Sequence, residues 1–228
     1  MDANGLVINI AVGLWIGLVV NWLADRLPGY GQTQPVPVPD HPRRRWLGVF
    51  AAGPIFGAYL TRFMNNPANG SLTNPWILWL GFALFLLILV VDVEHRRVLN
   101  VVVYPMLLLG VALAFVRAEI SPASALLGGL LGFGLFFLLF LLRPGGLGAG
   151  DVKLAALIGV LVGFPSVLVA LVTAIGLGGM GALVLLLSRR IGLRGTMAYA
   201  PYLSIGAMVG LLYGPAIVTW YLERLGIS

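Results

Sequence analysis

The sequence predicts an all-α, polytopic integral membrane protein with about eight transmembrane helices. Of its 228 residues, 60% are hydrophobic and only 10% are charged. The mean hydropathy of +1.00 lies well outside the range of soluble domains. Apolar segments recur along the whole length, so we expect the first to be a membrane helix rather than a signal peptide before a soluble domain.

Eight apolar segments predict the eight helices. They lie near residues 5–23, 46–63, 75–92, 101–117, 122–142, 152–164, 166–188 and 200–222. Most approach the roughly 20 residues that a bilayer crossing requires, but "GFPS" cuts the sixth segment short. A short, broken helix at membrane depth is tolerated only where protein or a water-filled cavity covers its ends. We therefore expect the sixth helix to line a cavity.

The arginines and lysines predict the orientation of these helices. With the N-terminus outside, the inner loops hold Arg26, Arg43, Arg44, Arg45, Arg96, Arg97, Arg143, Lys153, Arg189, Arg190 and Arg194. The outer side holds only Arg62, Arg117 and Arg224. The positive-inside rule then places both termini outside. One long inner loop, "GYGQTQPVPVPDHPRRRW", has alternating prolines that favour an extended, semi-rigid linker.

Composition also excludes several functions. The chain has no cysteine, which rules out disulfides, thiolate zinc sites and a cysteine nucleophile. Its net charge of +6 is typical of basic residues that flank membrane spans, so we expect no nucleic-acid partner.

Two of the eight acidic residues stand out. Asp2, Asp25, Asp40, Glu119 and Glu223 fall in predicted termini or loops, where a solvated charge needs no explanation. Asp92 closes the run "LFLLILVVD" and Asp151 opens the sixth helix, both at predicted inner ends. Ionisable groups at such depth are costly and are candidates for function. Two simpler roles stay open: Asp151 as a helix N-cap, and Asp92 paired with Arg96 one turn later.

A pair of carboxylates suits amide hydrolysis. Two close carboxyls do not readily ionise together, so one keeps a proton while the other is charged. The charged group draws a proton from water, and the protonated group polarises the scissile carbonyl. The glycines of "GGLGAGD" permit tight turns and the close approach of an extended substrate strand.

Other catalytic designs find less support in the sequence. His41 and His95 are the only histidines, and neither HExxH nor GxSxG occurs. The glycine run lacks the GxxxxGK[ST] pattern of a phosphate loop. A metal site built from Asp92, Glu94, His95 and Asp151 is chemically feasible, although no spacing demands it.

The motifs around both aspartates resemble those of the type IV prepilin peptidases, the GxGD membrane aspartic proteases of bacteria. "GAGDVKLAALIG" is similar to the family's G-x-G-D-x-K-L motif, and "DVEHRRVLN" resembles its first aspartate motif. "GLVVNWLADRLP" and "APYLSIGAMVG" resemble its first helix and the entry to its last. The resemblance implies Asp92 and Asp151 as the catalytic pair, supported by Gly148, Gly150, Lys153, Arg96 and Asn100.

Two departures from the family pattern bear on function. Leu99 stands where the first motif usually has proline, which alters the turn before the fourth helix. The family commonly carries a cytoplasmic insertion with two cysteine pairs after the first helix, and this chain has only the proline-rich linker there. Many members also methylate the mature pilin with S-adenosylmethionine, and the missing insertion leaves that activity open.

The resemblance implies a domain division and a substrate. Residues 1–63 would form a reduced N-terminal region with the cytoplasmic linker, and residues 64–228 the membrane aspartic peptidase domain. Its partners would be prepilin or pseudopilin precursor helices in the bacterial cytoplasmic membrane, cut after a glycine between basic leader and helix. Peptidase activity would need no cofactor. Two alternatives remain, namely a transporter or channel that uses Asp92 and Asp151 as an ion or proton relay, and an inactive scaffold.

Overall fold

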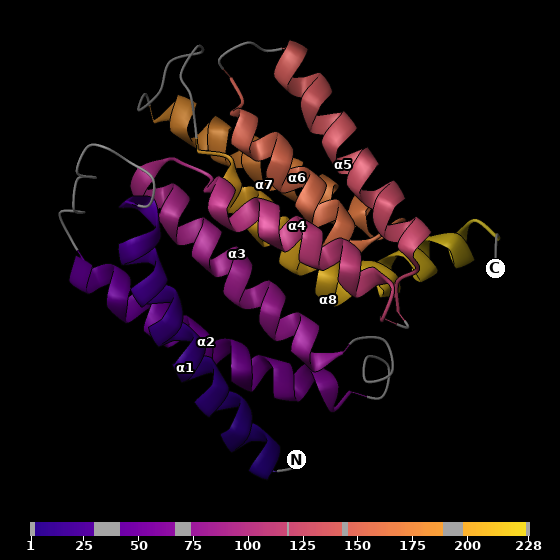
Figure 1. The fold of residues 1–228 in the computed structure, drawn as a ribbon. Coiled ribbons are helices and arrows are strands. Elements are labelled where there is room, and N and C mark those ends of the chain that lie inside the picture. Colours follow the sequence, from indigo (N-terminus) through magenta and orange to yellow (C-terminus); the bar gives the residue numbers. More distant parts are fainter. Residues whose placement is uncertain are drawn as a thin grey trace. The chain divides into compact units, whose positions relative to one another are not determined.

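The computed structural model describes residues 3–29, 42–66, 74–117, 119–142, 146–188 and 198–226. These residues form eight α-helices and one short 3-10 helix, with no strand among them (Figure 1). Residues 30–41 of the proline-rich linker lie outside the described residues, as do the side chains of Arg43 and Arg44 and the loop residues Asp2, Asp40, His41, Arg143, Arg189, Arg190 and Arg194. The predicted extended conformation is wrong for the last part of the linker, because residues 42–46 are helical.

The protein is a multi-pass helical membrane protein, as its composition predicts. Six of the helices in the described part of the chain are long and apolar enough to cross a membrane. The other two α-helices have 15 and 14 residues. The all-helical fold class is therefore confirmed. The count of eight crossings and the placement of both termini outside stay predictions.

By their contacts, the residues group into two compact units, Met1–His95 and Arg96–Ser228. The predicted functional division at residue 63 is a separate matter and stays a prediction. The first unit contains the helices α1 (Ala3–Arg26), η1 (Leu27–Gly29), α2 (Pro42–Met64) and α3 (Pro75–His95).

Close backbone contact joins α1 and α2. A Cβ atom added to Gly13 would lie 2.2 Å from the Gly53 carbonyl oxygen, and one added to Gly57 would lie 2.3 Å from that of Asn9. The pairing of 13 with 53 and 9 with 57 shows that the two helices run antiparallel. Small residues permit such close packing in a membrane, where apolar side chains gain little by leaving lipid.

Polar side chains join the three α-helices of the first unit near residue 9. The Asn9 amide donates to the Thr61 hydroxyl at 2.9 Å and accepts from the Trp79 indole at 3.3 Å. Polar groups within a bilayer need such partners, since lipid offers none.

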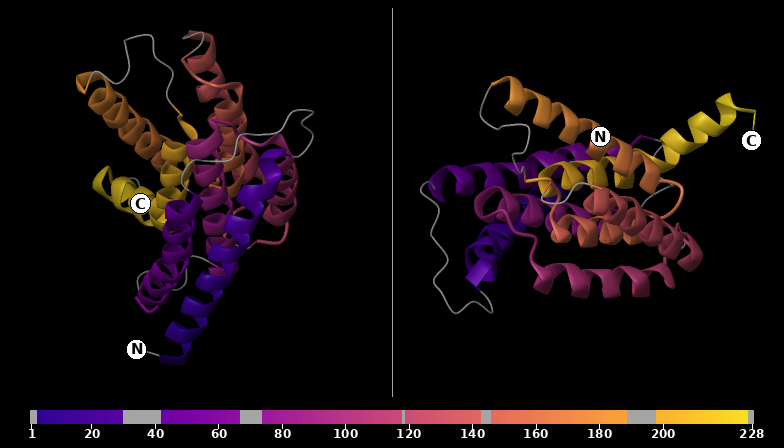
Figure 2. Two further views of the ribbon diagram at one scale, coloured as in Figure 1. Left: turned by 90° about the vertical axis from the view of Figure 1, so that its left-hand side faces the viewer. Right: turned by 90° about the horizontal axis from the view of Figure 1, so that it is seen from above.

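The second unit surrounds one short helix with four others. It contains the helices α4 (Asn100–Ala114), α5 (Pro122–Leu142), α6 (Ala149–Val162), α7 (Val167–Leu187) and α8 (Ala200–Arg224). The short helix is α6, which contacts α4, α5, α7 and α8 and has ten of its fourteen residues buried. Figure 2 shows α5 beside α6 from two directions. The sequence prediction of a short sixth helix is confirmed.

Glycines also set the α5–α6 contact. A Cβ atom on Gly128 would lie 2.3 Å from the Gly159 carbonyl oxygen, and one on Gly132 would lie 2.3 Å from that of Ala155. These antiparallel backbones are so close that neither glycine can carry a side chain without displacing a helix. The position of α6 is therefore fixed by backbone contact with α5.

Candidate active site

Asp92 lies near the end of the most buried membrane-spanning helix. The helix α3 continues to His95, and the Asp92 side chain sits within its buried surface, with the residue 4% exposed. Arg96 then adopts the left-handed backbone conformation, with φ of 51°, and is exposed. Arg96 thus lies just beyond the end of α3, and its pairing with Asp92 stays a prediction.

Asp151 lies in the first turn of α6, and the helix begins earlier than the sequence suggested. The N-cap is Gly148, and Asp151 is the third helical residue. Asp151 is therefore not the N-cap residue, which was one of the simpler roles left open. Its carboxylate nevertheless takes part in capping the start of the helix. The Gly148 N–H donates to Asp151 Oδ2 at 3.1 Å, and the Asp151 N–H donates to the Gly148 carbonyl at 3.0 Å.

This capping arrangement orients the carboxylate of Asp151. One oxygen accepts the Gly148 amide, as the third residue of a capping box does. The negative charge also lies at the positive end of the helix dipole. The residue is 7% exposed. The local structure therefore holds a buried carboxylate in a defined orientation at the start of a rigid helix.

Gly148 and Gly150 were predicted to support the site, and the structure explains the need for glycine differently at each position. A Cβ atom on Gly150 would lie 2.8 Å from Cβ of Val98, so packing against the segment before α4 requires glycine there. A Cβ atom on Gly148 would lie 3.2 Å from Asp151 Oδ2, inside ordinary contact distance. Both explanations involve close packing, whereas the sequence analysis expected room for substrate.

Lys153 and Asn100 are brought together. Lys153 Nζ donates to Asn100 Oδ1 at 3.1 Å and lies 5.0 Å from the centre of the Tyr104 ring. These polar and cation–π contacts join the N-terminal part of α6 to the N-terminal part of α4. The lysine is thus turned toward α4, in keeping with a supporting position.

The other end of α6 is held by two polar side chains that sequence reasoning did not identify. Arg117 Nη1 donates to the Leu161 carbonyl at 2.9 Å, and Ser124 Oγ donates to the Phe164 carbonyl at 2.6 Å. Gly163, with φ of 74°, ends the helix between them. Arg117 thus supplies a partner to a carbonyl that the helix end leaves unsatisfied, and Ser124 supplies one to a carbonyl just beyond the helix, as a short helix at membrane depth needs.

Tyr199 is a further neighbour of Asp151 that the sequence analysis missed. It precedes α8, donates its phenol to the Ala174 carbonyl at 3.3 Å, and packs on Phe136. Burial, and then the charge of Asp151, raise the pKa of Tyr199 to about 12. The phenol therefore keeps its proton at neutral pH. In the sequence, the indication of this part of the site was the family-like segment "APYLSIGAMVG", which starts at Ala200.

Asp92 belongs to the first compact unit and Asp151 to the second. Their action as a pair stays a prediction from the sequence motifs, to which the structure adds the local setting of each carboxylate. Among the described residues, no group of three or more His, Cys, Asp or Glu side chains could hold a metal ion.

Both aspartates lie within a segment that matches a known family. The sequence model of the type IV leader peptidase family matches residues 79–185. The matched segment covers a little under half of the chain, and over it the chain is similar to this family. The matched segment also contains the five supporting residues.

Curated relatives carry a consistent name. A prepilin leader peptidase/N-methyltransferase of Bacillus subtilis (strain 168) is 26% identical over 141 residues, which cover 62% of this chain and 57% of the relative. The protein of the same name from Aeromonas hydrophila is 26% identical over 163 residues, covering 69% and 55%. That from Pseudomonas aeruginosa is 29% identical over 143 residues, covering 60% and 49%. The match thus extends over about half the length of these relatives, and no solved structure matches the chain.

Proposed function

We propose that this protein is a membrane-embedded aspartic endopeptidase that removes the basic leader from prepilin or pseudopilin precursors. The observation that carries the proposal is the match to the type IV leader peptidase family across both aspartate motifs. The buried settings of Asp92 and Asp151, each at a helix end, support it. The family and the relatives' names do not favour the transporter alternative.

Two carboxyls can carry out the reaction without a covalent intermediate. The ionised one takes a proton from water, which attacks the scissile carbonyl, while the protonated one donates a hydrogen bond to the carbonyl oxygen. The second group then gives its proton to the leaving amine. The capping bond from Gly148 keeps the Asp151 carboxylate oriented through these steps.

The proposal includes the place of the cut. With both aspartates at predicted inner helix ends, the scissile bond comes to the cytoplasmic face of a bacterial inner membrane. A substrate helix with its N-terminus inside carries a basic leader by the positive-inside rule. Resemblance to the family places a glycine just before the cut, between leader and helix.

Methylation of the new N-terminus is a separate question. The relatives' names include N-methyltransferase, which makes S-adenosylmethionine a candidate co-substrate. Transfer of a labelled methyl group to the cleaved product would establish the second activity directly.

The test uses the full-length protein in detergent or lipid nanodiscs with a purified pilin precursor. We expect a shortened product whose mass places the cut directly after the leader glycine. A precursor in which a β-branched residue replaces that glycine should stay intact, because a branched side chain beside the scissile bond takes up room that glycine leaves free. A cut within the hydrophobic segment would contradict the proposal, and no product would favour the inactive scaffold.

A further inference from the structure

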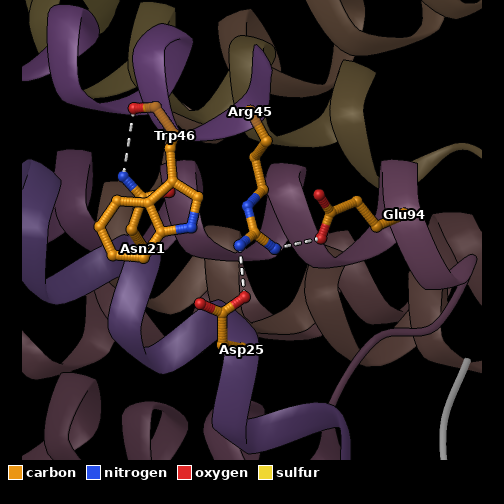
Figure 3. Close-up of polar contacts among 5 residues, drawn as sticks. All are labelled: Asn21, Asp25, Arg45, Trp46 and Glu94. Atoms are coloured by element: carbon orange, nitrogen blue, oxygen red, sulfur yellow. Dashed lines mark hydrogen bonds and ion pairs between the residues drawn. The ribbon is translucent and has the colours of Figure 1, made fainter. Parts of the chain in front are cut away.

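One buried guanidinium joins the three helices of the first unit at their predicted cytoplasmic ends. Arg45 of α2 donates through Nη1 to Glu94 Oε2 of α3 at 2.7 Å, and through Nη2 to Asp25 Oδ1 of α1 (Figure 3). The Arg45 side chain is 8% exposed, that of Glu94 11%, and that of Asp25 44%. Asp25 was predicted to be a solvated loop charge, and this is corrected: it lies in the last turn of α1.

The same stretch of α2 is tied to α1 a second time. The buried Asn21 amide donates to the carbonyl of Trp46, the residue after Arg45, at 3.4 Å (Figure 3). Buried charges are retained only when paired and hydrogen-bonded. Arg45 meets this requirement through carboxylates on two other helices, so its position depends on both.

The ion pair between Arg45 and Glu94 also restrains the end of α3, the helix that carries Asp92. Glu94 lies two residues beyond Asp92 in the last turn of α3, which ends at His95. The last turn of a helix frays readily because its carbonyls lack intrahelical partners. An ion pair to a neighbouring helix prevents this, and so holds the backbone that carries the Asp92 carboxylate. Arg45 itself acts on Asp92 only through Glu94 and the helix.

We propose that Arg45 is a positioning residue, which fixes the end of α3 through Glu94 and thereby sets the orientation of Asp92. This inference rests on the proposed peptidase function. Catalytic groups must be held in a well-defined position, and misplacement by about 1 Å can reduce the reaction rate on the order of 10²-fold. The role predicts a loss in kcat rather than in KM, because the substrate helix need not touch Arg45.

The experiment compares Arg45→Gln, Glu94→Gln and the double variant, each as full-length protein cleaving the same precursor. Arg97→Gln and Glu223→Gln are the matched controls, because they make the same chemical changes at exposed side chains. We expect both single variants to lose kcat by roughly 10- to 100-fold with little change in KM. The double variant should resemble the singles, since Arg45 and Glu94 act as a unit. The controls should cleave like the wild type.

A second measurement is independent of activity. Hydrogen exchange followed by mass spectrometry should show faster exchange of the amides of residues 92–95 in Arg45→Gln than in Arg97→Gln. The double variant, which removes both buried charges, gives the same readout if Arg45→Gln fails to fold.

The outcomes separate the two claims. Wild-type kcat in Arg45→Gln and Glu94→Gln, or unchanged exchange at residues 92–95, would overturn the positioning role while leaving the peptidase function intact. A rise in KM with unchanged kcat would also overturn it, because it would place Arg45 in substrate binding. A wild-type protein that leaves the precursor uncut would overturn the peptidase function, and this inference with it.

Discussion

Replacement of Gly128 by alanine should destabilise the protein, whereas the same change at Gly134 of the same helix should not. The Cβ atom that alanine adds at position 128 would lie 2.3 Å from the Gly159 carbonyl oxygen, although ordinary contact begins at 3.4 Å. The backbone of α6 cannot yield like a flexible side chain, so α5 and α6 must separate by about 1 Å, at a cost of about 3 kcal/mol. The higher helix propensity of alanine offsets about 1 kcal/mol of this loss in unfolding free energy. The net loss at Gly128 is therefore roughly 2 kcal/mol.

Gly134 provides the matched control. Nothing lies within 4 Å of a Cβ atom added there, and the residue is exposed. Gly134→Ala should therefore stabilise the helix by up to about 1 kcal/mol. Reversible unfolding in mixed micelles, followed by circular dichroism, measures both changes in unfolding free energy. Changes of the same sign and size in the two variants would refute the inference that backbone contact fixes α6.

Three further predictions concern the site. Gly150→Ala should lower cleavage because its Cβ would lie 2.8 Å from that of Val98. Adding Val98→Ala should recover part of the activity, and no recovery would argue that Gly150 contacts the substrate instead. Lys153→Arg should keep measurable cleavage, since the lysine is turned toward α4, and a loss as complete as that of an aspartate variant would place it in the chemistry. Because the chain has no cysteine, Asp92→Cys with Asp151→Cys should allow specific cross-linking by a short bis-thiol reagent, and failure to cross-link in a folded protein would contradict the pairing.

The sequence predicts the helices of this protein well because their signals are local. Long apolar runs give the membrane spans, and "GFPS" marks the end of α6 at Val162. The start of α6 was less well predicted: Asp151 was expected to open the helix, which begins at Ala149. Gly148 has no side chain to form a capping hydrogen bond, and Asp151, three residues later, carries the stronger N-cap pattern.

Contacts between helices were harder to predict, because they depend on packing between distant segments. Asp25, Arg45 and Glu94 are separated by 20 and 49 positions, and no local pattern in the sequence joined the three. Arg117 was counted only as an outer charge, yet its guanidinium holds the Leu161 carbonyl. The motifs could identify the aspartates, whereas the residues that hold their helices in place emerged only from the fold.

The most direct test of the account measures precursor cleavage by the wild type, Asp92→Asn, Asp151→Asn and the double variant in parallel. Asparagine keeps the volume of aspartate but removes the ionisable group. We expect each single variant to fold and to yield no detectable product, with the double variant no worse than either, because two carboxyls that share one reaction act as a unit. Mass spectrometry quantifies the product, and circular dichroism checks the fold. Substantial cleavage by either single variant would contradict the assignment of Asp92 and Asp151 as the catalytic pair.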